Sequence, residues 1–257
     1  MTQEQQMDDL IRCLLAERKE YQDIGVPSKL PDKRRLLRSL MNVRPPAPVS
    51  KEFLRAQDAY LQERLVQRGV TRLQDLTPVR PGLYLWQGDI TTLAVDAIVN
   101  AANSGMTGCY IPCHGCIDNA IHTYAGIQLR LECARIMAGQ RGEEPVGQAK
   151  ITKAYNLPCR YVLHTVGPMI EGAVTKTDRE QLSSCYRSCL DLAAANGLHS
   201  VAFCCISTGE FHFPNELAAQ IAIETVRDWQ RQNSDKIEVI FNVFKDSDRE
   251  LYKRLLG

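Results

Sequence analysis

The apolar run from Val201 to Ile206 (Val-Ala-Phe-Cys-Cys-Ile) constrains the fold more than any other segment. An uninterrupted run of this kind is typical of a strand that is buried on both faces, as in parallel sheets covered by helices. The pattern predicts further strands near 83–86, 97–99, 149–154, 160–166 and 237–241, and helices near 116–137, 178–196, 214–231 and 247–256. Strands that alternate with helices predict an α/β domain with a largely parallel central sheet.

The first 75 residues show a different, helical pattern. Met7, Leu10, Ile11, Leu14 and Leu15 repeat at the spacing of one helix face. A second helix is expected to begin near Pro31, and a third to run from an N-cap at Ser50 to Gly69, with a proline-rich connector over 44–48 between them. We therefore expect a helical extension over 1–75 and a main domain over 80–257. The extension shows no catalytic pattern and is interpreted as packing on the main domain, with partner docking or substrate selection as the alternative.

The charge balance excludes some classes of function. Lys and Arg total 31 and Asp and Glu total 30, so the chain lacks the basic field of a nonspecific nucleic-acid binder. No apolar run approaches the roughly 18–20 residues of a membrane span. The polar, acidic start of the chain fits neither a secretory signal nor a presequence. The expectation is a cytoplasmic protein with no nucleic-acid and no membrane partner.

Ten cysteines are many for such a chain, and most are interpreted as reduced core residues. One group differs, because Cys109, Cys113, His114 and Cys116 lie within eight residues in a glycine-containing segment. Two thiolates and an imidazole suit zinc, and three protein ligands leave a fourth position open, as in catalytic sites. With Cys113 as a fourth ligand the site would be closed and structural. The spacing alone leaves both sites possible.

Three segments follow apolar strands and turn polar or glycine-rich, namely 100–116, 207–214 and 244–248. In open α/β sheets, ligands bind beyond the carboxyl ends of the strands. The small-residue turn at 207–209, which precedes a helix, offers N–H groups to an anion, although many such turns only cap the helix. The two commonest glycine-rich nucleotide fingerprints are absent from the sequence.

Five motifs in order resemble macrodomains, a family of modules that bind ADP-ribose. The first is Gly88-Asp89-Ile90-Thr91 followed by the segment from Val95 to Asn103 (Val-Asp-Ala-Ile-Val-Asn-Ala-Ala-Asn). The others are Asp118-Asn-Ala-Ile-His122, Ala154-Tyr-Asn-Leu-Pro158, His164-Thr-Val-Gly-Pro168, and Ile206-Ser-Thr-Gly209 with Phe211 and Phe213-Pro214. The resemblance covers about residues 80–257 and implies a three-layer α/β/α fold with a mixed, largely parallel sheet.

One departure indicates a branch of that family. Common hydrolytic macrodomains carry a glycine string before the Asp-x-x-Ile-His element, where this chain reads Gly-Cys-Tyr-Ile-Pro-Cys-His-Gly-Cys over 108–116. That segment resembles the zinc-containing macrodomains, which also carry a helical extension and in some bacteria are associated with a sirtuin-type ADP-ribosyltransferase. The resemblance implies one zinc ion per chain, held by Cys109, His114 and Cys116. It also implies a mono-ADP-ribosylated protein as substrate, with a lipoyl-carrier protein as a candidate.

The resemblance also implies a role for each site residue. Asp118 and Asn103 are expected to be catalytic, with Asn103 also binding the distal ribose. Asp89 is expected to accept a hydrogen bond from the adenine amino group, and Ile90 is also expected to bind ADP-ribose. The diphosphate is expected on Ser207, Thr208, Gly209, Glu210 and Phe211. His212 is interpreted as a surface residue, and His122 and His164 as core residues.

The expected function is removal of mono-ADP-ribose from a protein side chain, with release of ADP-ribose. The alternatives are a non-catalytic ADP-ribose-binding module, an O-acetyl-ADP-ribose deacetylase and a structural zinc protein. The sequence leaves open the modified protein, the linkage and the oligomeric state.

Overall fold

The computed structural model describes residues 2–233 and 237–257. It begins with three helices, α1 (Gln3–Ala16), α2 (Leu30–Val43) and α3 (Lys51–Arg68). Ser50 caps α3 by accepting a hydrogen bond from the Phe53 N–H, and Gly69, at φ 82°, ends it as the sequence predicts. The apolar faces of these helices form a core of their own, separate from that of the sheet.

The described residues contain one sheet of seven strands in the order β2-β3-β9-β8-β5-β7-β6. Its strands are β2 (Pro78–Arg80), β3 (Leu83–Gln87), β5 (Ala97–Ala101), β6 (Ala149–Lys153), β7 (Tyr161–Thr165), β8 (Ser200–Phe203) and β9 (Glu238–Val243). Neighbouring strands from β3 through β7 are parallel, whereas β2 and β6 pair antiparallel at the two edges. The predicted mixed, largely parallel sheet is therefore confirmed, and β8 contains the first three residues of the apolar run at 201–206.

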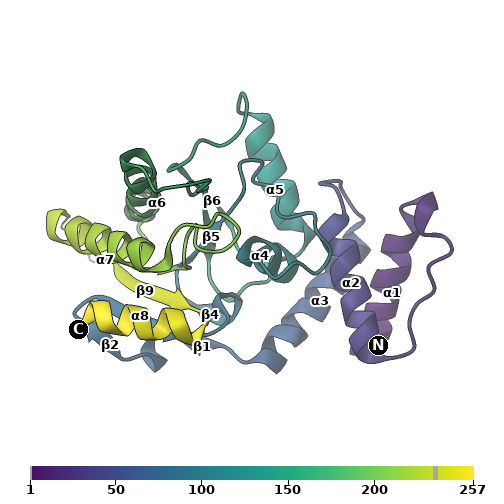
Figure 1. Cartoon of the computed structure of the whole chain (residues 1–257). Helices are drawn as coiled ribbons and strands as arrows, with labels where there is room; N and C mark the ends of the chain where they lie inside the picture. The colour runs from purple at the N-terminus through teal and green to yellow at the C-terminus, as the bar shows by residue number, and fades with distance from the viewer. Residues whose placement is uncertain (1, 234–236) are drawn as a thin grey trace.

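Helices cover both faces of the sheet (Figure 1). They are α4 (Ile117–Ala125), α5 (Ile127–Ala138), α6 (Lys176–Ala195), α7 (Asn215–Gln232) and α8 (Asp246–Leu256). Phe203 on β8 packs against Tyr186 of α6, with ring centroids 4.9 Å apart, and α7 lies against both α6 and α8. Asn100 of β5 points to the opposite face, where it contacts Asp118 of α4. This is the three-layer α/β/α arrangement.

The prediction of a single helix over 116–137 is wrong. Gly126, at φ 95° and ψ 171°, divides it into α4 and α5. The buried Gln57 of α3 accepts a hydrogen bond from the Ile127 N–H at 3.0 Å, which satisfies the start of α5. A contact from a distant segment thus replaces the continuous helix that the local pattern favours.

The N-terminal helices adjoin the main domain on the side of α4, which lies between the sheet and α2 (Figure 1). The short strand β1 (Thr71–Arg72), absent from the sequence-based prediction, pairs parallel with β4 (Leu93–Ala94). The main sheet begins at Pro78, two residues before the expected start of the domain. Across the described residues, no helix combines the length and the apolar character needed to cross a membrane.

Candidate active site

The loops at the carboxyl ends of the parallel strands, called here the carboxyl edge of the sheet, carry the residues that the sequence predicts for the site. Because strands β3, β9, β8, β5 and β7 run parallel, their carboxyl ends share this edge. The loop after β3 holds Asp89, the loop after β8 holds 207–213, and the loop after β5 holds 102–116. Edges of this kind bind ligands in open α/β sheets.

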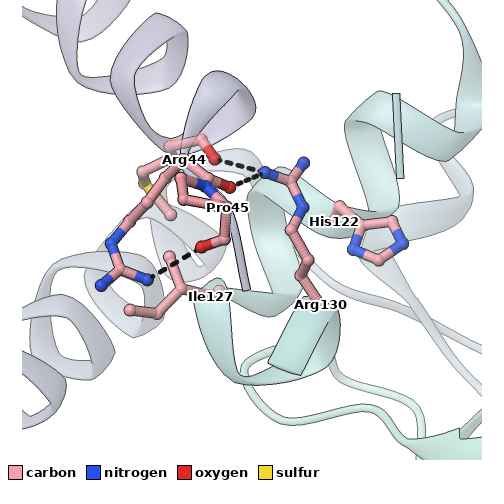
Figure 2. A pocket seen from close by; sticks show the side chains of 7 residues that line it. Arg44, Pro45, His122, Ile127 and Arg130 are labelled. Atoms are coloured by element: carbon pink, nitrogen blue, oxygen red, sulfur yellow. Dashed lines mark hydrogen bonds between the residues drawn. The ribbon is translucent and has the colours of Figure 1, made fainter. Parts of the chain in front are cut away.

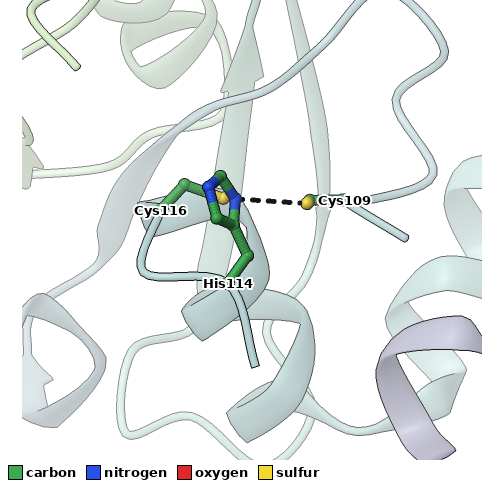
Figure 3. Close-up of side chains that lie close together, drawn as sticks. All are labelled: Cys109, His114 and Cys116. Atoms are coloured by element: carbon green, nitrogen blue, oxygen red, sulfur yellow. Dashed lines mark hydrogen bonds between the residues drawn. The ribbon is translucent and has the colours of Figure 1, made fainter. Parts of the chain in front are cut away.

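Cys109, His114 and Cys116 converge in the loop after β5 (Figure 3). Their donor atoms lie within 4.8 Å of one another, and Cys109 Sγ lies 3.4 Å from His114 Nδ1. A tetrahedral zinc ion with ordinary bond lengths holds a sulfur and a nitrogen ligand about 3.5 Å apart. The donor set and its spacing therefore fit zinc.

The surroundings of Cys116 add to that fit. Cys116 is the N-cap of α4, and its Sγ accepts a hydrogen bond from the Asn119 N–H. Burial raises the pKa of the Cys116 thiol to about 12, and the neighbouring Cys109 adds to the rise. The hydrogen bond from the Asn119 N–H acts in the opposite direction and lowers this pKa. Two close, partly buried sulfurs become thiolates readily only beside a cation, which a metal ion supplies.

The second ring nitrogen of His114 faces another loop. His114 Nε2 lies 3.5 Å from a carboxylate oxygen of Glu210, in the loop after β8. A metal-bound histidine usually donates its other N–H to a carboxylate or carbonyl group, which fixes the orientation of the ring. Glu210 stands where such a partner is needed.

Asp118 and Asn103 meet beside the three donors. Asp118 Oδ1 accepts a 2.8 Å hydrogen bond from Asn100 Nδ2, and its Oδ2 lies 3.5 Å from Asn103 Nδ2. Asn103 also donates to the Gly108 carbonyl, which ties it to the residue directly before Cys109. Burial raises the pKa of Asp118 to about 6, although the Asn100 hydrogen bond and the charge of Arg130 oppose the rise.

Two buried histidines lie behind Asp118. His164 contacts Asn100 through Nδ1 and Thr152 through Nε2, and burial lowers the pKa of His164 to about 3. Burial, with the nearby charges of His164 and Arg130, lowers the pKa of His122 well below its usual value. Both imidazoles are neutral parts of the core, as the sequence predicts.

The loop from Ser207 to Phe213 turns sharply before α7. Ser207 and His212 adopt left-handed conformations, at φ 65° and 56°, and the Phe213 N–H donates to the Ser207 carbonyl. Within the described part of the chain, the N–H groups of Gly209, Glu210 and Phe211 donate no backbone hydrogen bond. Several free N–H groups in one tight loop form an anion-binding concavity. His212 is exposed, in agreement with the surface position expected for it.

Asp89 lies at the far end of this edge, after β3. It caps a short helical turn, η3 (Ile90–Thr92), and its Oδ1 accepts from both the N–H and the hydroxyl of Thr91. Its Oδ2 pairs with Arg68, the last residue of α3, at 2.9 Å. Ile90 is buried, so its side chain belongs to the core beneath this turn.

Comparison with known proteins identifies the family. A family model described as Macro domain matches residues 99–222. A protein-ADP-ribose hydrolase of Treponema medium is 57% identical over 261 residues, with 100% of both chains covered. One of Staphylococcus aureus strain MSSA476 is 49% identical over 249 residues, which cover 96% of this chain and 93% of that one. The chain belongs to the macro domain family.

The macrodomain fold is confirmed by solved structures as well. A Trypanosoma brucei macrodomain in complex with ADP-ribose is 32% identical, with a TM-score of 0.67. That alignment covers 85% of this chain and 95% of the other. The segment that matches the family model, 99–222, contains Cys109, His114 and Cys116. It also contains Asp118 and the 207–213 loop.

Cys113, a possible fourth ligand from the sequence, points away from the other three donors of this macrodomain. Its Sγ lies 3.4 Å from the Arg35 carbonyl and 3.2 Å from Ser39 Oγ, both on α2. Its backbone is left-handed, at φ 53°, which turns the side chain toward the extension. The donor cluster thus consists of three residues and has the form of an open site.

Sequence reasoning missed several residues that support the site. Asn100 orients Asp118, and the only local signal for it is a polar residue at the end of an apolar strand. Gly108, at φ 87°, leaves room for the His122 ring, which an added Cβ would approach to 3.0 Å. Arg38 and Arg68 reach the site from the extension, where the sequence carries no signal for either.

Proposed function

We propose that this macrodomain is a zinc-dependent protein ADP-ribosylhydrolase, which removes mono-ADP-ribose from a protein side chain. The observation that carries the proposal is the convergence of Cys109, His114 and Cys116, with Asp118 two residues beyond Cys116 in the first turn of α4. A module that only binds ADP-ribose has no need of an open three-ligand cluster beside a buried carboxylate. The names of the relatives, protein-ADP-ribose hydrolase, support the same activity.

Cys109, His114 and Cys116 would hold the zinc ion. When bound, zinc acts as a Lewis acid toward an oxygen of the substrate or lowers the pKa of a bound water. Glu210 orients His114 from the opposite loop. The remaining steps fall to side chains of the chain itself.

The ligand would lie along the carboxyl edge of the sheet. Asp89 is available to the adenine amino group at one end, because its side chain stays 39% exposed despite its contacts with Arg68 and Thr91. The free N–H groups of the 207–211 loop would bind the diphosphate in the middle. In this order the distal ribose would lie beside Asn103 and Asp118, close to Cys116.

Hydrolysis breaks the bond between ribose C1″ and the protein side chain and joins C1″ to the oxygen of water. A proton must leave the water, and a proton must reach the departing side chain. Asp118 is the carboxylate placed to accept the first proton or to hold a ribose hydroxyl. Asn103 is placed to bind the ribose through an amide that the Gly108 carbonyl and the Gly105 N–H orient.

The test is release of free ADP-ribose from chemically defined substrates. The panel contains a mono-ADP-ribosylated lipoyl-carrier protein, peptides modified on acidic, serine or arginine side chains, and O-acetyl-ADP-ribose. Each is incubated with the zinc-loaded protein and with protein treated with a chelator. We expect release from at least one modified protein, and loss of that release after chelation.

Each other outcome selects a different function. Tight ADP-ribose binding without release from any substrate would identify a binding module. Turnover of O-acetyl-ADP-ribose alone would identify a deacetylase. Release that persists without metal would leave the hydrolase intact and remove zinc from its mechanism.

A further inference from the structure

One face of α2 is turned toward the metal-binding loop, defined here as residues 109–116. Arg35, Arg38, Ser39 and Asn42 follow at positions i, i+3, i+4 and i+7, so they share a helix face. All four contact the loop or the start of α4, Arg35 through its carbonyl group. Helix faces that pack inside a protein are usually apolar, whereas this face of α2 contacts the loop through hydrogen-bonding groups.

Arg38 contacts the loop at two points that bear on its ligands. Its Nη2 donates to the His114 carbonyl at 3.0 Å. Its Nη2 and Nε donate to Asn119 Oδ1, at 2.7 and 3.2 Å. Asn119 is fully buried, and its N–H in turn donates to Cys116 Sγ. The Arg38 guanidinium therefore holds the backbone of His114, and it also holds Asn119, whose N–H donates to Cys116 Sγ.

Asn42 holds the same loop one turn further along α2. Its Oδ1 accepts a 2.9 Å hydrogen bond from the Cys113 N–H, and its Nδ2 donates to Thr123 Oγ1 on α4. Asn42 is 1% exposed, so both hydrogen bonds are shielded from water. The left-handed residue Cys113 lies between the ligands Cys109 and His114, so this contact fixes the path of the loop between them.

The end of α2 is anchored to the main domain as well. Arg130 of α5 donates through Nη1 to the carbonyls of Met41, Asn42 and Arg44, where α2 ends. Figure 2 shows the Arg130 guanidinium directed toward Arg44 at this end of the helix. The last carbonyls of a helix lack partners within the helix, and a cationic side chain satisfies them. The Arg130 guanidinium also lies 4.4 Å from the centroid of the Tyr110 ring, in the metal-binding loop. Arg130 therefore contacts the extension and the loop at once.

We propose that α2 is a structural part of the metal centre and that Arg38 is a positioning residue for its ligands. Arg38 acts through the His114 carbonyl and Asn119, and holds His114 and Cys116 in the arrangement that binds the ion. The inference rests on the proposed zinc site. It assigns the extension a role in metal binding, which differs from packing alone and from partner docking.

The role can be separated from the stability of the extension. The apolar core of the three N-terminal helices uses the other faces of α2, through Leu37, Leu40 and Met41. A change at Arg38 removes donors to the loop and leaves those contacts intact. Loss of the guanidinium leaves the His114 carbonyl without this donor and leaves the buried oxygen of Asn119 with only the Thr123 hydroxyl, at 3.5 Å. Buried acceptors that lose a hydrogen bond destabilise the arrangement that exposes them, which here is that of the loop.

The test measures zinc affinity in the full-length protein by competition with a chromophoric chelator. We expect Arg38→Met to weaken zinc binding about 10- to 100-fold, the usual effect of removing a group that orients metal ligands. Arg38→Lys, which keeps the charge but reaches one acceptor, should lie between this variant and the wild type. Arg35→Met is the matched control, because this side chain is exposed one turn away and contacts the loop only through its carbonyl. Its affinity should equal that of the wild type.

A second readout is the visible absorption of the cobalt-substituted protein, which reports on ligand geometry. The spectrum should change in Arg38→Met and Arg38→Lys and stay constant in Arg35→Met. Wild-type zinc affinity and an unchanged cobalt spectrum in both Arg38 variants would overturn the inference. If Arg38→Met does not fold, Arg38→Lys alone decides between the two results. A wild-type protein that binds no zinc would instead refute the proposed metal site.

Discussion

Nη1 of Arg68 lies 2.9 Å from Oδ2 of Asp89, and the Arg68 guanidinium lies 3.6 Å from the centroid of the Tyr124 ring. The last residue of α3 thus orients the carboxylate expected to bind adenine. The other carboxylate oxygen is held by Thr91. The N-terminal helices therefore reach both ends of the site, at Asp89 through Arg68 and at the metal-binding loop through Arg38.

Replacement of Asp89 tests the adenine end. Asp89→Ala should weaken ADP-ribose binding by about 1–3 kcal/mol, the usual cost of losing a charge-assisted hydrogen bond. Calorimetry with free ADP-ribose measures the change. Asp228→Ala, at an exposed position near the end of α7, is the control and should bind like the wild type. Unchanged affinity in Asp89→Ala would place the adenine elsewhere.

A methyl group at Gly167 tests the diphosphate loop. The Cβ of Gly167→Ala would overlap the hydroxyl of Ser207 and lie 2.8 Å from Ile206 Cγ2, so Ser207 and Ile206 must shift. We expect ADP-ribose to bind about tenfold more weakly, a loss of about 1.4 kcal/mol. Gly172→Ala is the matched control, because nothing lies within 4 Å of its added Cβ. Equal affinities in the two variants would show that Ser207 does not shape the ligand site.

The ionisation of Asp96 should make the free energy of unfolding depend on pH in the acid range. Burial raises its pKa, but hydrogen bonds from the His199 and Ser200 N–H groups and the Arg160 guanidinium outweigh burial and lower it. A carboxyl whose pKa is lower in the folded state stabilises fully above its unfolded pKa of about 4 and loses this effect as pH falls through the folded value. Asp96→Asn should therefore cost about 1–3 kcal/mol at pH 7 and less at pH 3.

Urea unfolding of the wild type and Asp96→Asn across this pH range measures the difference. The exposed Asp23→Asn variant controls for the general effect of acid on the protein. A gap between Asp96→Asn and the wild type that stays constant from pH 7 to pH 3 would contradict the assigned ion pair and hydrogen bonds.

Loss of zinc should leave the fold in place. The two apolar cores lie around the sheet and among the N-terminal helices, and neither contains a residue of the metal-binding loop. The wild type should carry about one zinc ion per chain, and Cys116→Ala should lose most of it. The far-ultraviolet circular dichroism of this variant should equal that of the wild type. Metal analysis and dichroism of the same sample check this. Collapse of the fold would identify a structural zinc site instead.

The fold could be predicted because its central strands are apolar over most of their length, as in β8 and β9, and because turns separate them clearly. The break at Gly126 could not be predicted from its neighbours. Ile121, Ala125 and Leu129 continue at helical spacing across it, and all three are buried. The residue that stabilises the break is Gln57, which lies about 70 residues earlier in the chain.

The site was predictable where its members are close in sequence. Cys109, His114 and Cys116 lie within eight residues, so their convergence needs only one loop. Arg38 and Asn119 lie 81 residues apart, and an arginine on a helix is ordinarily a solvated residue. The direction of Cys113 depends on a left-handed backbone and on α2, neither of which the spacing of the cysteines encodes.

The three-donor cluster is expected to act on the reaction rather than on binding. The decisive measurement pairs single-turnover release of ADP-ribose from a modified protein with calorimetric binding of free ADP-ribose, in Cys116→Ala and His114→Ala. Contacts of Asp89 and the 207–211 loop are expected to supply binding that persists throughout the reaction, whereas the cluster should act mainly in the transition state. We expect release to fall at least about 100-fold, or about 2.7 kcal/mol, and affinity to change less than about tenfold. Equal losses of release and affinity would contradict the claim and show that the cluster only shapes the pocket.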